Sequence, residues 1–200
     1  MQSSRRQDDL PDRGAALRIT GGMARGVPLS SPRAPGVRPT TDRVRSALFN
    51  ILARYGIEDA YVADLFAGTG SLGIEALSRG AAHSGFVEAD RRQIAVIKAN
   101  LQTAGFADRA DVHAARAEDA LDRLGSCDFL LMDPPYTQPF PAALITRIGE
   151  AGLLRDEGIL VCGHSSRTAA DDRCGSLAKW DARRYGDVSL AFYSHAEAAA

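Results

Sequence analysis

The chain has 200 residues with a formal net charge of −1, and 45% of its residues are hydrophobic and 24% charged. These proportions are typical of a globular protein with one main core. The sequence has no apolar run near the ~20 residues of a membrane span, and its start, MQSSRRQDDLPDRG, lacks the apolar segment of a secretory signal. The three cysteines form no CxxC pair and the four histidines are dispersed, so we expect a reduced, cytoplasmic protein that binds no metal.

The two parts of the chain differ in charge. Residues 1–50 contain nine arginines and four aspartates, a net charge of +5, whereas residues 51–200 have a net charge of −6. A basic arm on an acidic body predicts that contact with a polyanion begins at the N-terminal end.

The N-terminal elements are short. Residues 1–16 are polar and rich in breakers, so we expect a disordered extension. Residues 17–29 (LRITGGMARGVPL) predict a β-hairpin about a glycine turn, and Thr41 or Asp42 can cap a helix that ends at Arg54. Residues 17–54 therefore form the predicted basic arm, residues 55–195 the main domain, and residues 196–200 a frayed tail.

From residue 60 onward, short apolar runs alternate with helical patterns. Such alternation predicts an α/β fold, with a mostly parallel sheet covered by helices on both faces. The last two strands form an antiparallel hairpin about the turn Tyr185-Gly186-Asp187. We expect seven strands, at residues 60–66, 83–89, 110–115, 127–133, 158–164, 176–184 and 188–195. The helices are expected at residues 72–80, 92–105, 118–124 and 140–152.

A glycine motif follows the first of these strands. Gly68, Gly70 and Gly73 fit G-x-G-x-x-G between a strand and a helix, where glycines allow a tight turn and a close approach to a ligand. Glu88 ends the second strand twenty positions after Gly68, where a carboxylate can accept both hydroxyls of a ribose. The pattern predicts a nucleoside-bearing cofactor and leaves NAD and S-adenosylmethionine open.

The fourth strand ends in a rigid elbow, Asp133-Pro134-Pro135-Tyr136. Proline donates no N–H to a sheet, so the strand must stop there. This elbow suits methylation of an exocyclic amine, whose nitrogen is a poor nucleophile. Asp133 and the Pro134 carbonyl can accept its two N–H groups and so hold the nitrogen in line with the methyl donor. Tyr136 can stack on the base. Because the elbow suits methylation, S-adenosylmethionine is the favoured cofactor.

Four stretches together resemble the RsmD family of bacterial 16S rRNA (guanine-N2)-methyltransferases: RPTTDRVRSALFNIL, DLFAGTGSLGIEALSRGA, FVEAD and LLMDPPY. The resemblance implies a class I S-adenosylmethionine-dependent methyltransferase fold, Rossmann-like, after a small N-terminal hairpin and helix. It implies a loop guanine of 16S rRNA in the small ribosomal subunit as substrate. We expect a monomer, with Asp133, Pro134, Pro135 and Tyr136 as its catalytic residues.

The resemblance also implies residues for the cofactor and the RNA. The expected S-adenosylmethionine contacts are Thr40, Thr41, Asp64, Phe66, Ala67, Gly68, Thr69, Gly70, Glu88 and Ala117. The residues expected to face RNA phosphates are Arg25, Arg38, Arg43 and Arg45.

Three positions depart from the family pattern: Arg116 where an acid is common, Ser46 where a glutamate is common, and Gly163 where a glutamate is usual. The alternatives are an adenine-N6 DNA methyltransferase, which normally carries a target-recognition domain, and a glutamine-N5 protein methyltransferase, which favours Asn at position 133. A Rossmann NAD-dependent dehydrogenase and a non-catalytic RNA-binding factor are the alternatives from other classes.

Overall fold

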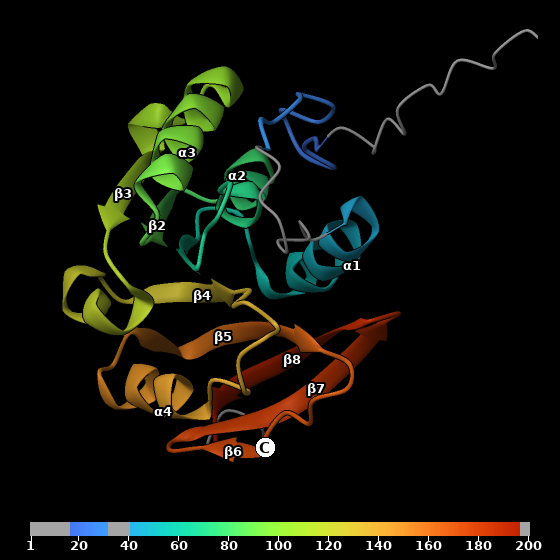
Figure 1. Ribbon diagram of the computed structural model, residues 1–200, viewed down its shortest axis with the longest axis vertical. Helices are drawn as coiled ribbons and strands as arrows, with labels where there is room; N and C mark the ends of the chain where they lie inside the picture. Colours follow the sequence, from blue (N-terminus) through green and yellow to red (C-terminus); the bar gives the residue numbers. More distant parts are fainter. Residues whose placement is uncertain (1–16, 32–40, 197–200) are drawn as a thin grey trace, which may run out of the picture.

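The computed structural model describes residues 17–31 and 41–196. Its centre is one sheet in the order β3-β2-β1-β4-β5-β8-β7-β6 (Figure 1). Strands β1 to β5 are parallel, and β8 lies antiparallel between β5 and β7. The strands are β1 Tyr61–Leu65, β2 His83–Glu88, β3 Ala110–Ala114, β4 Cys127–Met132, β5 Leu154–Ser165, β6 Arg173–Cys174, β7 Leu177–Tyr185 and β8 Val188–His195. The predicted α/β class and the closing antiparallel hairpin are confirmed.

Helices cover both faces of the sheet, as predicted. Strand β4 shows why: Phe129 and Leu131 pack with α1 and α2, whereas Leu130 and Met132 pack with α4. Successive side chains of a strand point to opposite faces, so a strand covered on both sides is apolar throughout. The helices are α1 Asp42–Leu52, α2 Ser71–Ser78, α3 Arg91–Ala104 and α4 Ala142–Glu150, with 3₁₀ turns η1 Ala53–Tyr55 and η2 Ala107–Arg109. No helix within the described ranges is long and apolar enough to cross a membrane.

The N-terminal segment is less regular than the expected hairpin. Its two halves form one antiparallel bridge, Arg18 with Pro28, beside backbone hydrogen bonds from Ile19 N to Val27 O at 3.0 Å and from Leu29 N to Leu17 O at 2.9 Å. Met23 N donates to Ser78 O at 2.7 Å, and Ala24 N donates to Ser78 Oγ at 3.0 Å. The turn therefore also bonds to the end of α2.

Two other expectations need correction. The sheet has eight strands in the described residues, because two-residue β6 pairs with the start of β7. The helix expected at 118–124 is two 3₁₀ turns, η3 Ala117–Asp119 and η4 Leu121–Arg123. Ala117, Ala120 and Leu121 are buried. Side chains three residues apart share a face in a 3₁₀ turn as well as in an α-helix, so the apolar spacing did not distinguish these two structures.

The sheet register determines which loops meet. Leu65, the last residue of β1, pairs with Met132 of β4, and Met132 pairs with Cys162 of β5. The glycine loop after β1, the elbow after β4 and the end of β5 therefore lie side by side at the carboxyl edge. Ligands bind at this edge in open parallel sheets.

Candidate active site at the carboxyl edge of the sheet

The glycine loop leaves β1 through an unusual backbone conformation. Phe66 has φ +60°, followed by Gly68 at +55° and Gly70 at +77°. The left-handed region is strained for an aromatic residue, and such strain collects at functional sites. Ala67 N donates to Val87 O at 3.0 Å, and Gly70 N donates to Ala67 O at 2.7 Å before α2 begins. These bonds hold a tight loop between two parallel strands.

Glu88 connects this loop to the end of β2. Its Oε2 accepts the Gly68 N–H at 2.8 Å, and its Oε1 accepts the Asp90 N–H at 2.8 Å. One carboxylate oxygen therefore lies beside the glycine loop and the other beside the turn after β2. The nearest atom to a Cβ built on Gly68, Phe66 O, is 3.9 Å away, so that side of the loop is open to a ligand.

Asp64 lies beneath the loop and is 1% exposed. Its Oδ2 accepts the Gly73 N–H at 2.9 Å, so its carboxylate anchors the first turn of α2. The pKa of Asp64 is raised to about 7, mainly by burial. The nearby Asp133 and Glu88 charges also raise it, whereas the hydrogen bond from Gly73 lowers it. A Cβ on Gly73 would collide with the Phe86 ring, so the third glycine allows α2 to approach β2 closely.

The elbow after β4 brings Asp133 and Tyr136 into contact. Tyr136 Oη donates to Asp133 Oδ1 at 2.7 Å, and the Tyr136 side chain is 39% exposed. Burial raises the pKa of Tyr136, and the Asp133 carboxylate raises it further, so the phenol remains a donor at neutral pH. Pro134 is buried, whereas Pro135 is exposed. The elbow thus presents a fixed carboxylate and a partly accessible aromatic ring next to the glycine loop.

The predicted RNA-facing arginines separate into different environments. Arg25 and Arg43 are exposed, and Arg38 lies outside the described residues. Arg45 is fully buried: its Nη2 donates to Arg18 O at 2.6 Å and to Asp42 Oδ1 at 2.7 Å. Burial lowers the pKa of Arg45, although the Asp42 and Glu75 charges oppose the shift. The prediction that Arg45 faces phosphates is therefore wrong, because it packs on the inner face of α1.

The structure describes Thr41 and Ala117, two further predicted cofactor positions. Thr40 lies outside the described residues, and Thr41 caps α1, its Oγ1 accepting the Val44 N–H at 3.4 Å. Ala117 is buried at the start of η3, which follows β3. Next to it, Arg116 Nε lies 3.7 Å from Glu118 Oε2, so the arginine that departs from the family pattern is paired with the neighbouring acid.

Sequence reasoning missed two buried polar residues, Asn100, which supports the glycine loop, and Glu75, which holds the N-terminal segment. Asn100 Nδ2 donates to Thr69 O at 2.9 Å, and its Oδ1 accepts the Ser30 N–H at 2.7 Å. Glu75 accepts the Thr20 N–H at 2.8 Å and the Arg79 Nε–H at 2.9 Å. Both lie on buried helix faces, and a polar residue among apolar neighbours was the available signal.

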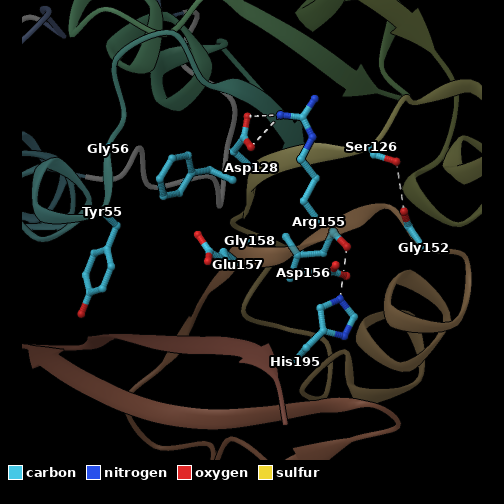
Figure 2. Close-up of a pocket in the computed structure, with 12 residues that line it drawn as sticks. Tyr55, Gly56, Ser126, Asp128, Gly152, Arg155, Asp156, Glu157, Gly158 and His195 are labelled. Atoms are coloured by element: carbon cyan, nitrogen blue, oxygen red, sulfur yellow. Dashed lines mark hydrogen bonds and ion pairs between the residues drawn. The ribbon is translucent and has the colours of Figure 1, made fainter. Parts of the chain in front are cut away.

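A cavity of about 660 Å³ lies elsewhere, at the amino edge of β4 and β5. Figure 2 shows its lining, in which Arg155 Nη1 contacts both Asp128 oxygens at 2.7 Å. It includes neither the glycine loop nor the elbow, so size alone does not mark the reactive site. Among the described residues, no group of His, Cys, Asp and Glu side chains could hold a metal ion.

Residues 17–194 match the family described as Conserved hypothetical protein 95. A Bacillus subtilis protein named putative rRNA methyltransferase YlbH is 34% identical over 181 residues, covering 88% of this chain and 98% of that protein. The ribosomal RNA small subunit methyltransferase D of Escherichia coli K12 is 41% identical over 145 residues, 72% of each chain. Among solved structures, the putative methyltransferase yhhF from Escherichia coli has a TM-score of 0.79 at 34% identity, covering 90% of this chain and 98% of that one.

The strand order, the glycine loop after β1 and the elbow after β4 define a class I methyltransferase fold. The family match spans most of the chain, and the similar structure shares both its fold and a third of its residues. The chain belongs to the Conserved hypothetical protein 95 family, the RsmD family, and is a methyltransferase. This result sets the dehydrogenase and the non-catalytic factor aside.

Proposed function

We propose that this methyltransferase transfers a methyl group from S-adenosylmethionine to the exocyclic N2 of a loop guanine in 16S rRNA of the small ribosomal subunit. The observation that carries the proposal is the Asp133–Tyr136 pair beside the glycine loop, fixed by the pairing of β4 with β1. The names of the relatives, two of them ribosomal RNA methyltransferases, support the substrate class.

The residues of the glycine loop fit S-adenosylmethionine. Glu88 offers two carboxylate oxygens to ribose hydroxyls, both already accepting N–H donors at 2.8 Å. Gly68 leaves the loop backbone open on one side, and Ala67 and Gly70 would hold the methionine part. When bound, S-adenosylmethionine supplies an electrophilic methyl group on a sulfonium centre.

The elbow supplies the groups that orient the nucleophile. The Asp133 carboxylate and the Pro134 carbonyl accept the two N–H groups of the guanine amine, which directs its lone pair towards the methyl group. Holding two reactants in line accounts for a large part of enzymatic acceleration, up to about 7–11 kcal/mol. Tyr136 holds Asp133 through the hydroxyl bond at 2.7 Å, and its exposed ring surface stacks on the base. Asp133 accepts the proton that the nitrogen loses after methylation.

The exposed arginines complete the proposal. Arg25 lies on the N-terminal turn and Arg43 on the first turn of α1, and both are open to solvent. With Arg38 they contact rRNA phosphates and offset the acidic body. Arg45 has no such role, because its guanidinium is buried against Asp42.

Methyl transfer from tritiated S-adenosylmethionine tests the proposal. Purified protein is incubated in parallel with small subunits from cells that lack the modification, with free rRNA and with DNA. The proposal predicts label in 16S rRNA of the subunits and none in DNA. Label in DNA alone, or in no nucleic acid while S-adenosylmethionine binds, contradicts it.

A further inference from the structure

His164, near the end of β5, is a buried polar residue to which the methyl transfer assigns no role so far. It is 7% exposed, and its Nε2 has no hydrogen-bond partner among the described residues. Its Nδ1 lies 2.9 Å from the Ser165 carbonyl oxygen. A carbonyl oxygen only accepts, so in the neutral ring the hydrogen lies on Nδ1 and Nε2 keeps its lone pair. Burial lowers the pKa of His164, against the Ser165 and Thr168 carbonyls that raise it, and this favours the neutral ring.

The imidazole of His164 lies beside the elbow. It lines a small cavity together with Pro134 and Tyr136, the residues that the proposed function assigns to the amine and to the base. The Phe140 ring makes a T-shaped contact with the imidazole, with ring centroids 5.4 Å apart. A buried acceptor without a donor costs free energy, and such groups are rare in folded proteins. This cost has a purpose if a donor reaches Nε2 when the substrate binds.

An exposed turn forms one side of this cavity. Pro135, Gln138 and Pro139 line it, residues 135–139 are exposed, and the Gln138 N–H donates to the Pro135 carbonyl at 3.1 Å. The free volume is about 10 Å³, close to what one water molecule needs, so a base does not fit while the turn is closed. Segments with exposed backbone hydrogen bonds open locally at low free energy, so this turn is the side of the cavity through which a base enters.

The bases that carry an exocyclic amine differ in the ring nitrogen beside it. In guanine this nitrogen, N1, carries a hydrogen and donates. In adenine and cytosine the ring nitrogen next to the amine has a lone pair and accepts. An imidazole nitrogen that keeps its lone pair therefore suits guanine and repels the other two. Enzymes that act on an extruded base read it by hydrogen bonds to this same edge.

We infer that His164 selects guanine: the turn at residues 135–139 opens for the base, and Nε2 accepts the guanine N1–H while Asp133 and Pro134 hold the amine. The inference rests on the proposed function and deepens it, because it names the contact that distinguishes guanine from adenine. It gives the buried nitrogen a donor and adds no chemical step.

Two amide variants test the acceptor. The side chain of His164→Gln reaches the position of Nε2 with its carbonyl oxygen, whereas that of His164→Asn ends near the position of Nδ1. His164→Gln should keep kcat on subunits within about threefold of the wild type, and His164→Asn should lower it by about 10-fold, as expected for one lost hydrogen bond. The Kd for S-adenosylmethionine should be unchanged in both. Equal losses of kcat, or no loss in either variant, would make His164 a packing residue and overturn the inference.

Nitrogen NMR of histidine-labelled protein tests the tautomer without turnover. The His164 signals, assigned by their loss in His164→Gln, should show a hydrogen on Nδ1 and none on Nε2 near neutral pH. A hydrogen on Nε2 would make it a donor and overturn the inference whatever the substrate is. The methylated nucleoside tests the proposed function separately. A wild type that makes no N2-methylguanosine contradicts that function, whereas equal rates of N2 methylation by the wild type and His164→Asn contradict only the role of His164.

Discussion

At the scale of single residues, similar side chains have different roles according to where the fold places them. Asp133 and Asp128 lie at opposite ends of β4, one bonded to Tyr136 and the other paired with Arg155. Asp64 is enclosed, with a raised pKa, and bonds to the backbone of α2. Of these three aspartates, Asp133 alone follows the carboxyl end of a strand and bonds to an accessible tyrosine, so we assign the chemistry to it.

Asp133→Ala should separate catalysis from cofactor binding. It removes the acceptor for the amine and leaves the Glu88–Gly68 contact in place. Turnover should fall by at least ~100-fold, as with loss of other positioned polar groups, while the Kd for S-adenosylmethionine stays within a few-fold. Calorimetry and the tritium assay measure the two quantities. Asp128→Ala is the matched control, and an Asp133 variant that turns over as fast as this control contradicts the assignment.

Asp64 should make folding depend on pH in a specific direction. Its pKa is about 7 in the fold, raised first by burial, against a reference value of 3.8. Between these values the folded state holds a proton that the unfolded state has lost, so the free energy of unfolding falls as pH rises, by at most about 1.4 kcal/mol per pH unit. Asn cannot titrate and still offers an oxygen to Gly73.

Urea titration between pH 4 and 8 measures the free energy of unfolding of both proteins. The value for Asp64→Asn minus that for the wild type should therefore increase as pH rises. Parallel curves for wild type and Asp64→Asn would mean that Asp64 is ionised throughout this range.

At the scale of elements, the N-terminal segment is bonded to the two helices that flank the cofactor loop. Asn100 of α3 bonds to Ser30 and Thr69, and Glu75 of α2 bonds to Thr20. Leu17, Ile19 and Leu29 pack in one core with both helices. The basic arm is thus continuous with the methyltransferase body in the described residues.

Asn100→Ala should loosen this connection. It leaves the Ser30 N–H and the Thr69 carbonyl without their partner, and an unsatisfied buried group costs about 1–3 kcal/mol. Stability should fall by that amount, and S-adenosylmethionine affinity should weaken because Thr69 belongs to the glycine loop. Thr103→Ala, which loses only a bond to Ala99 O on the exposed side of α3, is the control. Equal affinity for S-adenosylmethionine in the two variants would show that Asn100 does not support the glycine loop.

Elements with a strong local pattern could be predicted from the sequence. The signal for such an element lies in adjacent residues of the sequence. Examples are strands β1 and β4, the cap of α1 at Thr41 and the turn at Gly186. The segment at 17–29 pairs with itself only briefly, and the bonds from its turn to Ser78, some fifty residues away, could not be predicted from the local sequence. The prediction for Arg45 was wrong because this residue lies on the buried face of α1 with Phe49 and Leu52, where its charge does not face solvent.

At the scale of the whole molecule, the exposed arginines lie on separate elements. Arg25 and Arg43 are exposed on the N-terminal elements, whereas Arg123 and Arg155 lie near the amino edge by the start of β4. The body beyond residue 50 is net acidic, so attraction of RNA depends on where the cations lie more than on their number.

Replacing Arg25 and Arg43 by Gln should weaken subunit binding and flatten its salt dependence. Each lost phosphate contact changes the slope of log affinity against log salt by roughly 0.7 to 0.9. Arg123→Gln with Arg155→Gln changes net charge equally beside the start of β4 and should leave the slope unchanged. Filter binding across salt concentrations compares the pairs. The same slope for both pairs would show that a different face docks the subunit.

The most direct test of the central claim is the identity of the methylated atom. Subunits methylated by the wild type are digested to nucleosides and analysed by mass spectrometry, with Asp133→Ala in parallel. The account predicts N2-methylguanosine in 16S rRNA from the wild type and almost none from the variant, because the elbow holds an exocyclic amine of guanine. Methylation at a ring nitrogen or a ribose hydroxyl, or at N2 with undiminished yield in Asp133→Ala, would contradict it.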